Sequence, residues 1–84
     1  MYKVYLERAA ERDLKQLSSQ LFGRIIVKIK ALDANPWPPG CRKISGSKSD
    51  WRIRIADYRV IYEVDDAERA VKIMRVRHRR EVYR

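Results

Sequence analysis

The chain contains the stretch WRIRI at residues 51–55, followed after two residues by YRVIY at residues 58–62. Apolar and basic residues alternate at a period of two, which is typical of a β-strand with one face in a core and the other in water. The side expected to face water carries Arg52 and Arg54, and Arg59 lies at the start of the second strand, directly after Tyr58. Because a row of guanidinium groups repels itself unless an anion lies over it, we interpret the stretch as a β-hairpin that forms a phosphate-binding floor.

Apolar residues also predict the elements that precede this hairpin. They alternate in residues 2–6, which indicates a first strand, and recur at helical spacing through residues 8–32, which indicates two helices. Ser18 and Ser19 interrupt the pattern and can cap the second helix after a tight turn, so that the two helices are antiparallel. The stripe expected to face the sheet is Leu14, Leu17, Leu21, Ile25, Ile29 and Leu32. Its expected partners in the sheet are Val4, Trp51, Ile53 and Ile55.

The remaining segments complete a meander of strands. Three prolines in residues 35–40 end the helices and form a connector, and residues 42–44 are expected to form a short edge strand. A tight turn is expected at residues 56–57, and a last strand at residues 70–77 with Met74 and Val76 on one side and Arg75 and Arg77 on the other. The order predicts an α+β fold: a strand, two antiparallel helices, then an antiparallel meander sheet, with residues 1–84 as a single domain.

The charge of the chain limits the kinds of partner. Lys and Arg outnumber Asp and Glu by 20 to 11, and residues 42–84 hold 13 basic and 7 acidic residues, +6 of the total +9. This excess favours nucleic acid or an acidic protein as partner. No apolar run is long enough to span a bilayer, and no signal peptide is apparent, so we expect a cytoplasmic protein with no membrane partner. The single cysteine, Cys41, excludes an internal disulfide and a Cys-rich zinc site.

Six residues are candidates for chemistry on RNA. They are Arg52, Arg54, Arg59, His78, Arg79 and Tyr83. Cleavage without a metal or cofactor needs a base for the 2′-hydroxyl, cations for the phosphorane oxygens and a proton for the leaving oxygen. Arginine suits the second task but is a poor base, whereas a histidine or a tyrosine among cations can move protons. Further RNA contacts are expected at Lys43, Lys48, Arg75, Arg77 and Arg80. Composition alone favours simple nucleic-acid binding over catalysis.

Two segments resemble the signatures of a known family. Residues 51–64 resemble the core signature of the RelE/ParE toxin superfamily, and residues 76–84 resemble its closing motif. Asn35-Pro36 with Pro38-Pro39-Gly40 and the order of elements match as well, so that the resemblance covers nearly the whole chain.

The resemblance implies a small cytoplasmic toxin of a type II toxin–antitoxin system. RelE-type members enter the ribosomal A site and cut the messenger RNA there; a cognate antitoxin holds them inactive, and operator DNA is bound only through the toxin–antitoxin complex. The family's phosphate-contact and catalytic positions fall on Arg52, Arg54, Arg59, Arg79 and Tyr83. His78 stands where some members have a catalytic histidine and others a lysine.

Three functions remain open from the sequence. The best-known RelE branch has lysines at positions 52 and 54, one of which moves a proton, so the base here is expected to be His78 or Tyr83. The ParE branch shares the fold, poisons DNA gyrase and generally lacks the full arginine, histidine and tyrosine set, so the set favours the ribonuclease. A plain nucleic-acid-binding module is the third alternative. The antitoxin is expected to be partly helical, with apolar anchors and acidic contacts to the basic surface.

Overall fold

The computed structural model describes residues 1–82, which form a five-stranded sheet and three helices. The strands are β1 (Lys3–Leu6), β2 (Arg42–Lys43), β3 (Asp50–Ile55), β4 (Tyr58–Asp65) and β5 (Ala70–His78). The helices are α1 (Arg8–Lys15), α2 (Ser19–Ala31) and α3 (Arg79–Val82). The strand order is β1-β5-β4-β3-β2; β1 runs parallel to β5, and all other neighbours are antiparallel. The predicted α+β fold is confirmed, with a mixed rather than purely antiparallel sheet.

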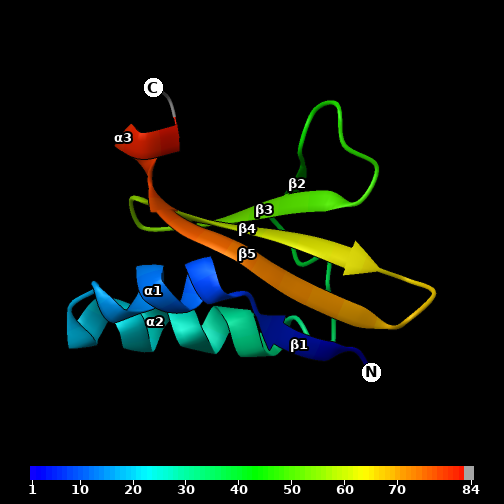
Figure 1. Cartoon of the computed structure of the whole chain (residues 1–84), viewed down its shortest axis with the longest axis horizontal. Helices are drawn as coiled ribbons and strands as arrows, with labels where there is room; N and C mark the ends of the chain where they lie inside the picture. Colours follow the sequence, from blue (N-terminus) through cyan, green and yellow to red (C-terminus); the bar gives the residue numbers. More distant parts are fainter. Residues whose placement is uncertain (83–84) are drawn as a thin grey trace.

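The two longer helices cover one face of the sheet. In Figure 1, α1 runs away from β1 and α2 runs back beneath the sheet, whereas α3 lies on the opposite side near the turn between β3 and β4. The Ser18 side chain accepts a hydrogen bond from the Leu21 N–H (3.2 Å), so Ser18 is the helix cap of the two serines and Ser19 is the first residue of α2. Within residues 1–82, no helix is long and apolar enough to cross a membrane.

The core forms where the predicted stripe meets the sheet. Leu14, Ile25, Ile29, Leu32, Ile53 and Ile55 are buried in it, and Leu17, Val4 and Trp51 pack against it half-buried. Leu21, which was expected in the stripe, is half-exposed and is not part of this core. The buried face of β4 is formed by Val60, Tyr62 and Val64, so the residues between them face away from the helices.

The proline connector is fixed to the sheet by aromatic residues. The buried Tyr62 hydroxyl donates a hydrogen bond to the carbonyl oxygen of Pro36 (2.6 Å). Burial, with Cys41 nearby, raises the pKa of Tyr62, so the hydroxyl keeps its proton and this bond. The Trp37 ring packs edge-on against Trp51 (6.3 Å between centroids) and Tyr2 (6.0 Å). The connector therefore has a defined path from α2 to β2.

A bulge in β5 changes the predicted alternation. Ile61 pairs with Arg75 and Tyr62 with Ile73, so Met74 has no cross-strand partner. Met74 is exposed, whereas Val76 is buried. Of the two residues expected on one side of this strand, only Val76 belongs to the core.

The edge of β5 beyond the end of β1 is closed by a carboxylate of α1. Asp13 Oδ2 accepts hydrogen bonds from the Val76 N–H (2.9 Å) and from Arg75 Nε (2.8 Å), and Oδ1 accepts one from Arg75 Nη2 (3.2 Å). Partial burial alone would raise the pKa of Asp13, but the bonds from Arg75 and Val76 outweigh it and hold that pKa below its ordinary value.

We expect Asp13→Ala to lower the free energy of unfolding by about 2–3 kcal/mol, because a partly buried N–H and a guanidinium lose their acceptor. Since the pKa of Asp13 is lower in the folded chain, its contribution is present above the unfolded pKa of about 4 and is lost as pH falls further. Urea denaturation at pH 7 and pH 3 measures both effects. The exposed Glu11→Ala on the same helix is the control, and an equal loss in both variants would contradict this role of Asp13.

Candidate functional site

Three arginines stand in one row across the face of the sheet opposite α1 and α2. Arg54 of β3 pairs with Arg59 of β4, and Arg59 pairs with Arg77 of β5. Directly paired residues of antiparallel strands lie about 4.5–5.5 Å apart between Cα atoms, so three positive charges share a small area. We call Arg54, Arg59 and Arg77 the arginine row. Its mutual repulsion is relieved by a negative charge placed over it.

The members of the row differ in exposure. Arg54 is exposed, but Arg59 is only 6% exposed, although the sequence predicts it on a wet face. The reason is its central position between the side chains of Arg54 and Arg77 on the neighbouring strands. Arg77 donates a hydrogen bond from Nε to Glu81 of α3 (3.0 Å), which offsets part of the charge of the row.

A second pair of arginines lies one step along the hairpin. Arg52 pairs with Arg42 of β2 on one side and with Ile61 on the other. Arg42 was not among the residues expected to contact RNA, because its place beside Arg52 depends on the register between β2 and β3. Ile61 separates Arg52 from Arg75, whose guanidinium is bound to Asp13.

The start of α3 is fixed to the tip of the hairpin beside the row. The Arg79 N–H donates to the carbonyl oxygen of Asp57 (2.7 Å), and Arg79 Nη1 lies 4.0 Å from Asp57 Oδ1. Asp57 lies in the turn between β3 and β4, and the pair Ile55–Tyr58 separates this turn from the pair formed by Arg54 and Arg59. Arg79, with a side chain that is 53% exposed, is thereby held at the hairpin tip, near the row. The anchoring role of Asp57 was not predicted, since only the fold brings residue 57 to residue 79.

His78 occupies the last position of β5. It pairs with Tyr58, and the two rings pack edge-on, with centroids 5.2 Å apart and planes at 87°. Its Nδ1 accepts a hydrogen bond from the Arg80 N–H (3.2 Å). Because Tyr58 precedes Arg59 by one residue, strand alternation directs His78 and Tyr58 to the face opposite the arginine row.

The fold therefore brings together part of the predicted set. Arg54, Arg59, Arg77 and Arg79 gather near the hairpin tip, and Arg52 lies further along β3. His78 lies at the same end of the sheet but on the opposite face. Tyr83 lies outside the described residues. Lys43, Lys48 and Arg80 are exposed. Among residues 1–82, no three His, Cys, Asp or Glu side chains form a group that could hold a metal ion.

Comparison with known proteins identifies the family. A family model described as the ParE toxin of the type II toxin–antitoxin system parDE matches residues 4–83. The chain belongs to this toxin family, within the RelE/ParE superfamily. It is therefore a toxin of a type II toxin–antitoxin system, as the resemblance of its two motifs implied. A search of the curated proteins found no match.

Solved structures similar to this toxin are RelE proteins. RelE of the Pyrococcus horikoshii OT3 RelE–RelB complex is 26% identical with a TM-score of 0.83, over 93% of this chain and 94% of that chain. RelE of the Mycobacterium tuberculosis RelBE2 complex is 25% identical with a TM-score of 0.81, over 92% of this chain and 96% of that chain. The isolated Escherichia coli RelE toxin is 23% identical with a TM-score of 0.82, over 99% of this chain and 92% of that chain, and supports the fold.

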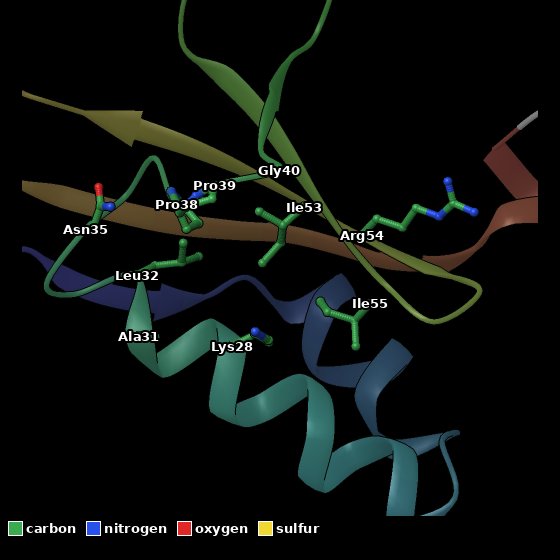
Figure 2. Close-up of a pocket in the computed structure, with 10 residues that line it drawn as sticks. All are labelled: Lys28, Ala31, Leu32, Asn35, Pro38, Pro39, Gly40, Ile53, Arg54 and Ile55. Carbon is green, nitrogen blue, oxygen red and sulfur yellow. The ribbon is translucent and has the colours of Figure 1, made fainter.

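The toxin also has an apolar groove between α2, the proline connector and β3 (Figure 2). Its lining residues are Lys28, Ala31, Leu32, Asn35, Pro38, Pro39, Gly40, Ile53, Arg54 and Ile55. In Figure 2, Ile53 and Ile55 lie along it, whereas the Arg54 side chain extends away. A second hollow continues along α2 past Val27, which is 64% exposed, and Arg24. At about 250 Å³ the groove is smaller than the usual ~300–1,000 Å³ of small-molecule sites.

Proposed function

We propose that this toxin is a ribosome-dependent endoribonuclease that cleaves messenger RNA in the A site by attack of the 2′-hydroxyl on the adjacent phosphate. The observation that carries the proposal is the arginine row, with Arg79 held near it at the hairpin tip. A cluster of permanent cations on a sheet face suits a phosphate whose charge increases in the transition state. Cytoplasmic action and binding of operator DNA only through the antitoxin complex belong to the same proposal.

In this mechanism the arginines hold the phosphate and another group moves the protons. Arg54 and Arg79 are exposed and can contact the scissile phosphate directly, with Arg52 beside them. Arg59, the buried central member of the row, contributes its charge without being exposed to the strand of RNA. An arginine cannot serve as base near neutral pH, so the proton of the 2′-hydroxyl passes to His78 or Tyr83. Lys43, Lys48 and Arg80 extend the basic surface along which the RNA strand can lie.

A second candidate function is inhibition of DNA gyrase without chemistry on RNA. The observation in its favour is that the matching family model describes the ParE toxin of parDE. Expression without antitoxin distinguishes the two functions. The ribonuclease should stop incorporation of labelled methionine within minutes while labelled thymidine is still incorporated. A gyrase poison should stop thymidine incorporation first and induce the DNA-damage response, which would contradict our proposal. A plain nucleic-acid-binding module need not inhibit the incorporation of either labelled methionine or labelled thymidine.

We further propose that an antitoxin segment binds the groove of Figure 2. Both relatives quoted from complexes are described together with RelB antitoxins, and this chain leaves Val27 exposed beside the groove. Lys28 and Arg24 lie along its α2 side, so a partly helical segment with apolar anchors and acidic flanks fits its chemistry.

Val27→Asp should weaken binding of the cognate antitoxin by about 10- to 100-fold, because a charge replaces an apolar contact at the interface. Titration calorimetry with the purified antitoxin measures the change. Ser45→Asp adds the same charge on the exposed loop before β3 and is the control. Equal affinity for both variants and the wild type would place the antitoxin elsewhere on the fold.

A further inference from the structure

The His78 side chain is engaged with the backbone of α3. α3 begins at Arg79, so His78 occupies the N-cap position, and its Nδ1 accepts the N–H of Arg80, the second residue of the helix. This is the bond that a Ser, Asn or Asp cap makes at other helix starts. The preceding N–H, that of Arg79, is bound by Asp57. Both contacts together fix the first turn of α3.

This bond determines which ring nitrogen carries the proton. A neutral imidazole has one protonated and one unprotonated nitrogen, and an acceptor must be the unprotonated one. The proton of neutral His78 therefore resides on Nε2. Nε2 then has no lone pair with which to accept a proton, and Nδ1 can accept one only by releasing the Arg80 N–H. The Tyr58 ring, edge-on at 5.2 Å, restricts the rotation that would exchange the two nitrogens.

We propose that His78 is a positioning residue: its ring, held by Tyr58, caps α3 through Nδ1 and so orients Arg79, and it transfers no proton in the reaction. The assignment is consistent with the opposite sheet faces of His78 and the arginine row. The absence of proton transfer by His78 has meaning only if the proposed ribonuclease function holds, whereas the capping role is independent of that function. Of the two proton carriers left open by the sequence, this leaves Tyr83, which lies outside the described residues.

The capping role is tested without RNA. His78 is the only histidine of the chain, so the full-length, ¹⁵N-labelled toxin without a histidine tag gives one pair of imidazole nitrogens. Long-range ¹H–¹⁵N correlation should show an unprotonated Nδ1 and a protonated Nε2. A neutral ring protonated on Nδ1 would overturn the proposal.

The role in the reaction is tested with two substitutions. His78→Asn keeps a side-chain acceptor at the cap and should cleave ribosome-bound messenger RNA within about threefold of the wild-type rate. His78→Ala removes the cap and should be slower by about 3- to 30-fold. If Asn were no better than Ala and both lost the 10²–10⁴-fold expected for a missing base, His78 would carry the proton and the proposal would be wrong.

Two controls separate the possible failures. Affinity for the antitoxin and the thermal midpoint of each variant report whether it is folded. Absence of cleavage by the wild-type toxin would overturn the proposed function, while the nitrogen spectrum would still decide whether His78 caps α3.

Discussion

Arg54→Ala is expected to slow cleavage of ribosome-bound messenger RNA by roughly 10²–10³-fold, which is the loss of one donor to charge that develops in the transition state. Arg54 is the exposed member of the arginine row, so its side chain can reach a phosphate without displacing the core. Single-turnover cleavage at saturating toxin measures the chemical step separately from binding to the ribosome. The free energy of unfolding should change little, because the side chain is not packed.

Two further variants make this result specific. Arg54→Lys keeps the charge but loses the planar fork, so it should retain part of the rate. Arg8→Ala removes the same charge from the exposed start of α1, far from the row, and should cleave like the wild type. If Arg8→Ala were slowed as much as Arg54→Ala, net charge rather than a phosphate contact would explain the effect.

Tyr83→Phe is expected to produce a loss of about 10²–10⁴-fold in the cleavage step, the usual contribution of a general base. The substitution removes one hydroxyl and keeps the ring, so affinity for the ribosome should remain close to that of the wild type. Rapid mixing of toxin with programmed ribosomes separates the two quantities. A wild-type cleavage rate in Tyr83→Phe, together with one in His78→Asn, would mean that neither residue moves the proton. The reaction would then rest on positioning by the ribosome and the arginines.

Local patterns predicted most of the fold. The alternation in residues 51–55 and 58–62 predicted the hairpin, and Ser18 and Ser19 marked the start of α2, because these signals are contained within a few consecutive residues. The parallel pairing of β1 with the start of β5 joins residues 3–6 to residues 70–73 and has no local signal. The bulge at Met74 likewise depends on the register of two strands.

The candidate site was less predictable for the same reason. The sequence contains these arginines, but their order across the sheet depends on the register of the strands. In the observed register Arg77 pairs with Arg59 and belongs to the row, whereas Arg75 forms an ion pair with Asp13 of α1. Arg59 was expected on a wet face and is buried because its neighbours on both sides are also long. The contacts of Asp57 with Arg79 and of Tyr58 with His78 could not be predicted, because only the folded chain brings the hairpin tip to the start of α3.

The central claim is that this toxin cuts messenger RNA in the ribosomal A site. The most direct measurement uses a purified translation system in which ribosomes hold a defined codon in the A site, followed by primer extension to map the new RNA ends. We predict a cut inside that codon that requires both the ribosome and the toxin, is blocked by the antitoxin and is slowed in Arg54→Ala. An intact message at toxin concentrations that inhibit supercoiling by DNA gyrase would contradict the account.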